Sequence, residues 1–204
     1  MRMGILGGTF DPVHYGHLLM AESCREELRL DQIRFIPARQ PPHKPGRLIS
    51  PQSDRAEMLR LAISAYPEFT MDCREFDREG PSFTVDTLAE LSIQFPEAQL
   101  YLIIGADSLQ DLLTWRQPDR IAEIAQLVVC NRPGYALPDR RQAIQWTGPE
   151  IGNTVEFVRM PGTDVSATEL RDRTSHHRSL RFLTPPAVEE YIRTNALYQR
   201  STDQ

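Results

Sequence analysis

Short apolar runs that suit β-strands alternate along this chain with segments whose apolar residues recur at the spacing of a helix. The run 100–105, Leu-Tyr-Leu-Ile-Ile-Gly, is the most apolar strand candidate and predicts a central strand. The predicted strands are 2–6, 32–37, 69–73, 100–105, 127–130 and 154–158, and the predicted helices are 16–30, 51–65, 84–95, 118–125, 138–146, 167–173 and 186–195. This order predicts an α/β protein with a parallel sheet and helices on both of its faces.

The length of 204 residues fits one generous domain. We therefore expect a single domain over residues 1–204, Rossmann-like and doubly wound, with a small helical portion at about 166–200. Because βαβ crossovers are right-handed, the loops that follow the strands should all reach one edge of the sheet. Ligands of such sheets bind at that edge, so residues just after each predicted strand are candidates for a site.

Charge and composition exclude several classes of protein. The formal net charge of −5 disfavours general nucleic-acid binding, and no apolar run approaches the length of a membrane span. The N-terminal residues are predicted to open the first strand, so we expect no secretory signal peptide. Cys24, Cys73 and Cys130 are odd in number and scattered, which favours reduced structural thiols over disulfides or a catalytic cysteine. We therefore expect a cytoplasmic protein.

The most informative segment for function is 7–17, Gly-Gly-Thr-Phe-Asp-Pro-Val-His-Tyr-Gly-His. It predicts a strand end, a tight glycine turn and a helix whose first turn carries His14 and His17. Glycines allow close approach of an anion, a helix N-terminus attracts it, and imidazoles add donors. The segment has neither the lysine of a P-loop nor the spacing of a dinucleotide fingerprint. The histidines could instead cap the helix or bind zinc, but no cysteine or carboxylate lies nearby at ligand spacing. A nucleotide phosphate site is favoured, and we expect no metal ligands from the protein.

Several later residues that follow predicted strands are candidates with ordinary alternatives. His43 and Lys44 lie in a proline-rich loop that suits an anion, or simply solvent. Asp107 could accept hydrogen bonds from ribose hydroxyls, or cap a helix. Trp115 could stack on an aromatic ring or pack in the core. Arg132 offers a fork that fits phosphate, or lies on the surface.

A second helix start that could bind an anion lies near the C-terminus. Ser166 is predicted to cap the helix and Glu169 to complete a capping box. The free N–H groups there, with a hydroxyl and Arg171 one turn further on, could hold an anion. Capping alone accounts for Ser166, whereas it leaves Arg171 without a reason.

Together these segments resemble the nucleotidylyltransferase superfamily and, over nearly the whole chain, bacterial nicotinate-nucleotide adenylyltransferases. The motifs that carry the resemblance are 7–17, 41–44, 81–84, 104–108 with Trp115, 130–135 and 166–171. The resemblance implies adenylyl transfer from ATP to nicotinate mononucleotide in NAD biosynthesis, giving deamido-NAD and pyrophosphate. It also implies Mg²⁺, which the ATP phosphates would carry for the most part.

The resemblance further implies a role for each matching residue. The catalytic residues, at the ATP phosphates, would be His14, His17 and Arg171. The other ATP-binding residues would be Gly7, Gly8, Thr9, Phe10, Gly16, Asp107, Ser166 and Thr168. The mononucleotide-binding residues would be His43, Lys44, Thr84, Trp115 and Arg132, with Trp115 stacked on the pyridine ring.

Other readings of the sequence stay open. Nicotinamide mononucleotide is an alternative acceptor, because the sequence does not show which way backbone donors near Thr84 point. A pantetheine-phosphate adenylyltransferase or a cytidylyltransferase would not account for the Pro-Pro-His-Lys loop together with Trp115. Replacement of the motif histidines would favour a non-catalytic nucleotide sensor on the same scaffold, but His14 and His17 are both present. The expected partners are ATP and nicotinate mononucleotide, without nucleic acid or membrane, and a homo-oligomer is left open.

Overall fold

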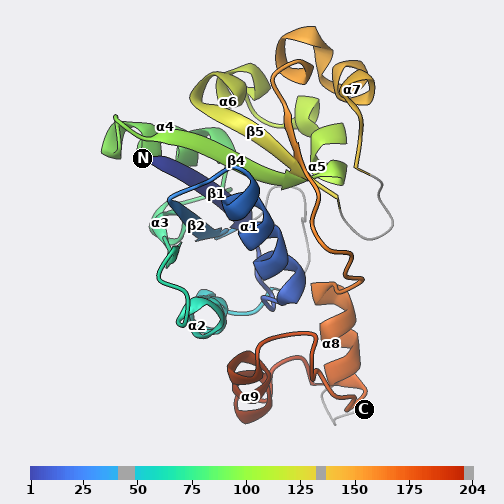
Figure 1. Ribbon diagram of the computed structural model, residues 1–204. Helices are drawn as coiled ribbons and strands as arrows, with labels where there is room; N and C mark the ends of the chain where they lie inside the picture. Colours follow the sequence, from blue (N-terminus) through green and yellow to red (C-terminus); the bar gives the residue numbers. More distant parts are fainter. Residues whose placement is uncertain (41–48, 132–136, 200–204) are drawn as a thin grey trace.

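The computed structural model describes residues 1–40, 49–131 and 137–199. Within these residues, six parallel strands form one sheet in the order β3-β2-β1-β4-β5-β6 (Figure 1). The strands are β1 (Arg2–Gly8), β2 (Gln32–Pro37), β3 (Phe69–Met71), β4 (Gln99–Gly105), β5 (Ala125–Cys130) and β6 (Glu156–Val158). Each lies where the sequence predicts a strand, and the run 100–105 is central as expected.

The strand order reverses direction between β1 and β4, which pair with each other at the middle of the sheet. From β1 the chain adds β2 and β3 on one side, and then β4, β5 and β6 on the other. The Rossmann-like, doubly wound prediction is therefore confirmed. In such sheets the crevice at the carboxyl ends of the two strands flanking the reversal is where ligands bind.

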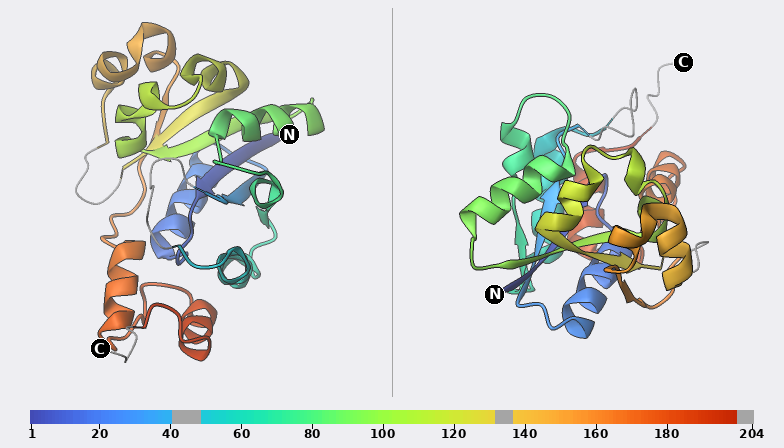
Figure 2. Two further views of the ribbon diagram at one scale, coloured as in Figure 1. Left: turned by 180° about the vertical axis from the view of Figure 1, so that it is seen from behind. Right: turned by 90° about the horizontal axis from the view of Figure 1, so that it is seen from above.

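Helices cover both faces of the sheet (Figure 2). They are α1 (Tyr15–Glu27), α2 (Gln52–Ile63), α3 (Arg74–Asp77), α4 (Thr84–Gln94), α5 (Ala106–Gln110), α6 (Pro118–Ile124), α7 (Arg140–Gly152), α8 (Ala167–Ser175) and α9 (Pro186–Thr194), with a 3-10 turn η1 (Leu112–Thr114). No helix in the described part of the chain is long and apolar enough to cross a membrane.

Strand β4 shows how one segment builds two apolar cores. Its side chains alternate between the faces of the sheet, as the pleat of a strand requires. Tyr101 and Ile103 pack in the core under α1 and α2, whereas Leu100, Leu102 and Ile104 pack in the core under α4–α7. Burial on both faces accounts for the uninterrupted apolar run in the sequence.

The C-terminal helices α8 and α9 lie together beyond the sheet, beside α1 and α2 (Figure 1). Leu170 of α8 and Val188 and Ile192 of α9 are buried in the same core as α1 and α2. The C-terminal helical portion predicted from the sequence thus packs on one face of the molecule.

The predicted glycine turn at residues 7 and 8 is wrong. Gly7 and Gly8 belong to β1 and lie opposite Ile36 and Pro37 of β2. The strand pairing continues to the end of β2, where the Ala38 N–H donates to the Gly8 carbonyl at 2.8 Å. The turn comes later, in residues 9–14, which we name the histidine loop. His14 itself is the N-cap of α1, so only His17 lies within the first helical turn.

Other predicted boundaries also need correction. Helices α3, α5 and η1 are too short for helical periodicity to reveal them. Helix α7 does not stop near Trp146 but continues to Gly152, through a kink where Gly148 has a φ of 81°. Pro51, predicted as the first residue of the helix at 51–65, is instead the N-cap of α2, so Ser50 before it does not cap the helix.

Ser82 and Thr84 are both residue types that favour the N-cap position, but neither of them caps α4. The N-cap is Phe83, and Thr84 is the first helical residue. The Ser82 hydroxyl oxygen accepts the Arg39 N–H at 3.0 Å instead, so it ties the end of β2 to the start of α4.

The three cysteines are free thiols, as predicted. Cys24 of α1 and Cys130 of β5 are both buried, with their sulfurs 3.1 Å apart. The hydrogen bond with Cys130, together with burial, raises the pKa of Cys24 far above its usual range. Burial also raises the pKa of Cys73. Neither effect favours a thiolate nucleophile.

Candidate active site

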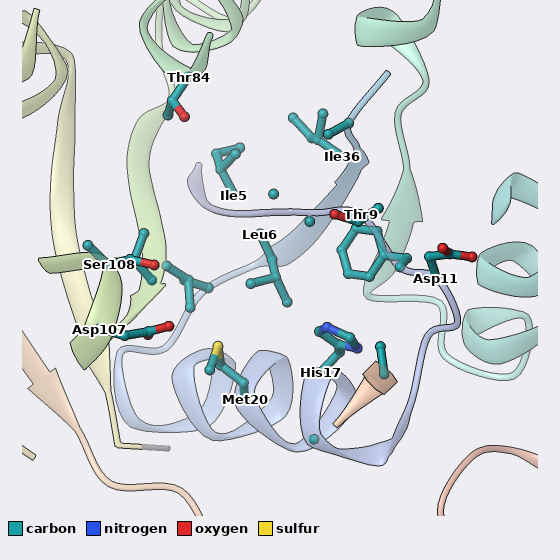
Figure 3. A pocket seen from close by; sticks show the side chains of 18 of the residues that line it. Ile5, Leu6, Thr9, Asp11, His17, Met20, Ile36, Thr84, Asp107 and Ser108 are labelled. Carbon is teal, nitrogen blue, oxygen red and sulfur yellow. The ribbon is translucent and has the colours of Figure 1, made fainter. Parts of the chain in front are cut away.

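A cavity of about 690 Å³ opens at the carboxyl ends of β1 and β4, where the strand order reverses. Figure 3 shows His17 on one side of this cavity and Thr84 on the opposite side, with Asp107 and Ser108 at the end of β4. Residues predicted from separate parts of the sequence therefore line one space.

The two histidines lie stacked at the start of α1. Their ring centroids are 3.8 Å apart with an angle of 30° between the ring planes. The backbone N–H of His14 donates to Nδ1 of His17 at 3.3 Å. Since this Nδ1 acts as an acceptor, the proton of a neutral His17 ring is on Nε2, which becomes a hydrogen-bond donor.

Phe10 packs against the His17 ring and supports this arrangement. Its ring meets the His17 ring edge-on at 5.0 Å between centroids, and its side chain is buried. A Cβ added at Gly8 would lie 3.0–3.3 Å from carbons of the Phe10 ring. Gly8 therefore allows the close approach of the aromatic ring that holds His17 in place.

Close packing also accounts for the glycine at position 16. A Cβ at this position would lie 3.0 Å from two atoms of the His14 ring and 3.5 Å from the Val165 carbonyl oxygen. The residue lets the segment before α8 pack close to the start of α1. A side chain there would displace the His14 imidazole.

The start of α8 faces the same cavity, which Ser166, Thr168 and Arg171 help to line. Ser166 is the N-cap, and its hydroxyl oxygen accepts the Glu169 N–H at 3.2 Å. The predicted capping box is only half formed, because the Glu169 carboxylate lies 3.8 Å from Arg173 Nη1. Salt-bridge partners one turn apart compete for that side chain.

Arg171 crosses from α8 to the histidine loop. Its Nη1 donates to the Asp11 carbonyl, and its Nη2 donates to the Thr168 hydroxyl at 3.0 Å. A guanidinium group has five N–H donors, so these contacts orient Arg171 and leave donors for a ligand in the cavity.

Replacing Ser166 with alanine should lower the melting temperature by about 2–4 °C, because the cap hydrogen bond of α8 is lost. Ser175→Ala, at the other end of α8, is the matched control, since that hydroxyl contacts the Asp172 carbonyl and the neighbouring His176 ring and caps no helix start. Thermal unfolding followed by circular dichroism measures both. Equal melting temperatures for the two variants would contradict the capping role.

Thr84, Trp115 and Arg116 line the other end of the cavity, and Asp107 lines it at the end of β4. Trp115 directly follows η1, and Asp107 lies within α5, whose N-cap is Gly105. Asp107 is therefore not a helix cap, which removes that alternative. Arg116 is a cavity residue that sequence reasoning missed. Its guanidinium lies 4.8 Å from the Phe83 ring centroid.

His43, Lys44 and Arg132, expected from the resemblance to bind the mononucleotide phosphate, lie outside the described residues.

A buried arginine beneath the site was also missed. Arg55 of α2 is 1% exposed and donates to the carbonyls of Thr9, Ala38 and Ser50 at 3.0, 2.7 and 3.1 Å. Burial lowers the pKa of Arg55, while the charge of Asp11 raises it. Helical periodicity gives no signal for such a residue, because an arginine on an amphipathic helix ordinarily faces solvent.

Glu75 forms a comparable buried acceptor near Thr84. The Thr87 hydroxyl donates to its Oε1 at 2.6 Å. Burial raises the pKa of Glu75, while hydrogen bonds from Thr87 and Ser82 lower it. Since Thr87 is in the first turn of α4, this carboxylate anchors the helix start that lines the cavity.

Comparisons with known proteins agree with this geometry. The sequence model described as cytidylyltransferase-like matches residues 5–173. A probable nicotinate-nucleotide adenylyltransferase of Thermomicrobium roseum is 43% identical over 97% of this chain and 92% of its own length. Another such protein, from Thermus thermophilus, is 42% identical over 98% of this chain and 100% of its own. This chain belongs to the nicotinate-nucleotide adenylyltransferase family.

The family fold extends to distant members. A Plasmodium falciparum nicotinic acid mononucleotide adenylyltransferase, solved in complex with NaAD, superposes with a TM-score of 0.78 over 97% of each chain. The sequence identity is 16%, so this likeness concerns the fold alone. The two bacterial relatives confirm the resemblance that the sequence motifs indicated, over nearly the whole length of this chain.

Proposed function

We propose that this protein transfers the adenylyl group of ATP to nicotinate mononucleotide, giving deamido-NAD and pyrophosphate. The observation that carries the proposal is one cavity with two chemically different ends. One end has the stacked histidines, Arg171 and the start of α8, which suit a polyphosphate. The other end has Trp115 and the start of α4, which suit an aromatic ring that bears an anion.

The proposed reaction is a direct displacement. An oxygen of the mononucleotide phosphate attacks the α-phosphorus of ATP in line, and the bond to the bridging oxygen of the β-phosphate breaks, so pyrophosphate leaves. His17 donates its Nε2–H to an α-phosphate oxygen, where charge builds up in the transition state. His14 and Arg171 hold the departing β- and γ-phosphates. The protein thus contributes alignment and electrostatic stabilisation, as in other phosphoryl transfers.

Gly7, Gly8, Thr9, Phe10 and Gly16 are proposed to allow close approach of ATP to the β1–α1 corner. Support comes from the cavity, which all five line, and from the tight packing at Gly8 and Gly16. Asp107 is proposed to accept hydrogen bonds from the ATP ribose, because its carboxylate follows β4 at the same edge.

We propose that Mg²⁺ reaches the site with ATP, on the phosphate oxygens. Among the described residues there is no group of three or more His, Cys, Asp or Glu side chains that could hold a metal ion. A metal cage made by the protein therefore does not fit this part of the chain, whereas Mg²⁺ commonly binds through substrate phosphates and water.

The acceptor end favours an acid over an amide. Helix α4 begins at Thr84, and its free N–H groups and positive dipole end stabilise a carboxylate. Arg116 lines the same end, and its guanidinium Nη1 also lies 3.3 Å from Oδ2 of Asp86 in the first turn of α4. His43, Lys44 and Arg132 are proposed, on the family motifs, to bind the phosphate of the mononucleotide.

The test is release of pyrophosphate from ATP in the presence of each acceptor. Nicotinate mononucleotide should support rapid release, with deamido-NAD as the second product. Nicotinamide mononucleotide and phosphopantetheine are the comparison acceptors. Release with phosphopantetheine alone, or with none of the three, would contradict the proposal.

Replacing Trp115 with leucine should raise KM for the mononucleotide about tenfold and leave KM for ATP unchanged, because a stacked ring contributes about 1–3 kcal/mol. Trp146→Leu in α7 is the matched control, since that side chain packs against the core away from the cavity. Steady-state kinetics with each substrate varied in turn measures both. An unchanged mononucleotide KM in Trp115→Leu would argue against stacking.

A further inference from the structure

The last part of the chain holds the histidine loop, although it lies beyond the region matched by the family model, which ends at residue 173. The Tyr15 N–H donates to the Leu183 carbonyl at 3.1 Å. The Thr184 hydroxyl donates to the Val13 carbonyl at 2.8 Å, and Thr184 is buried. The backbone on both sides of His14 is therefore bonded to residues far away in the sequence.

Tyr198 makes the most distant of these contacts. Its hydroxyl donates to Oδ1 of Asp11 at 2.6 Å, and Oδ2 of the same carboxylate accepts the Ser50 N–H at 3.4 Å. Asp11 is 3% exposed, so its carboxylate depends on these donors in place of water. Burial and the charge of Asp11 raise the pKa of Tyr198 well above its usual range. Tyr198 consequently keeps its proton and remains a donor.

The backbone between β1 and α1 needs such support. Phe10 has a φ of 49°, in the left-handed region that a bulky residue rarely adopts. Conformations of this kind persist only where the surroundings hold them. Hydrogen bonds hold the loop at several points along its length. The carbonyl of Thr9 accepts one from Arg55, the carbonyl of Asp11 accepts one from Arg171, and the carboxylate of Asp11 accepts one from Tyr198.

We propose that the segment 183–198, and Tyr198 above all, positions the histidine loop for catalysis. Tyr198 does not line the cavity, so it is a positioning residue that acts through Asp11. Its hydrogen bond keeps the loop in the one conformation that stacks His14 on His17 and directs both imidazoles toward the substrate phosphates. This inference rests on the proposed adenylyl transfer.

Tyr198→Phe removes only the hydroxyl, and the chain offers a matched control. Tyr191 of α9 also donates its hydroxyl to an aspartate, Asp54 Oδ1 at 2.8 Å, but Asp54 lies in α2 outside the histidine loop. We expect Tyr198→Phe to lower kcat about tenfold, with KM for both substrates within about twofold, because a small displacement of reacting groups is costly. Tyr191→Phe should keep the wild-type kcat.

A second readout does not depend on activity. Amide hydrogen exchange of a peptide that covers residues 11–18 should be faster in Tyr198→Phe than in the wild type and unchanged in Tyr191→Phe. A kcat close to that of the wild type for folded Tyr198→Phe, or equal exchange in the two variants, would overturn the inference. An inactive wild type would instead refute the proposed function, and the exchange data would still decide whether the segment orders the loop.

If Tyr198→Phe does not fold, substitutions of Thr184 test the same inference. Thr184→Ser keeps the hydroxyl that donates to Val13, whereas Thr184→Val removes it at nearly constant volume. Loss of kcat in Thr184→Val with recovery in Thr184→Ser supports positioning by the C-terminal segment. Equal kcat in both variants overturns it.

Discussion

Replacing His17 with alanine is expected to reduce kcat by roughly 10²–10³ while KM for ATP stays within about tenfold. The reason is the direction of its proton. Because Nδ1 of His17 accepts the His14 backbone N–H, the ring N–H that can donate to a substrate in the cavity is Nε2–H. That donor gains most when charge builds up on the α-phosphate, so its loss affects the transition state more than the bound substrate.

Rates of pyrophosphate release at saturating and at limiting ATP separate the effect on kcat from the effect on KM for ATP. His177→Ala is the control, since that histidine is exposed and lies outside the cavity lining. Both variants should keep the wild-type melting temperature within a few degrees, which corresponds to a change of less than about 1 kcal/mol in the free energy of unfolding. Near-wild-type turnover in folded His17→Ala would remove the catalytic role from this residue.

Replacing Arg55 with methionine is expected to lower the free energy of unfolding by about 3 kcal/mol or more, since each buried group that loses its partner costs about 1–3 kcal/mol. Methionine fills much of the same space but leaves the carbonyls of Thr9, Ala38 and Ser50 without their donors. Replacing both partners of a buried ion pair by apolar residues can leave stability unchanged. Here only the arginine is removed, and the backbone carbonyls stay buried without a donor, so the free energy of unfolding falls.

Urea unfolding followed by tryptophan fluorescence measures this effect. Arg60→Met is a matched control on the same helix, because Arg60 is exposed and pairs only with the neighbouring Glu57 among the contacts found for it. It should leave the free energy of unfolding essentially unchanged. Equal losses in the two variants would show that the buried hydrogen bonds of Arg55 are unimportant for stability.

Several parts of the site could be predicted from local sequence. The residues His14, His17, Ser166 and Arg171 stand in short motifs whose chemistry is legible without a structure. The motifs also follow predicted strands, and a parallel sheet collects such positions at one edge. The structure brings all four to one cavity.

Local patterns failed where long-range contacts decide. The glycines at 7 and 8 suggested a turn, but pairing with the last residues of β2 keeps them extended. Ser82 suggested a helix cap, but its hydroxyl is engaged by the Arg39 N–H. A hydrogen bond between distant residues leaves no periodicity in the sequence, so propensity alone could not have predicted either outcome.

The sequence by itself determined the alternation of strands and helices, the doubly wound class of sheet, and several of the residue types that line the cavity. Those features follow from apolar periodicity and from motifs that span a few residues. Only the tertiary structure decided how the histidine loop is held, through Arg55 from α2 and Tyr198 from the far end of the chain. Buried polar groups must find partners wherever the fold brings them, and that choice depends on packing rather than on neighbours in the sequence.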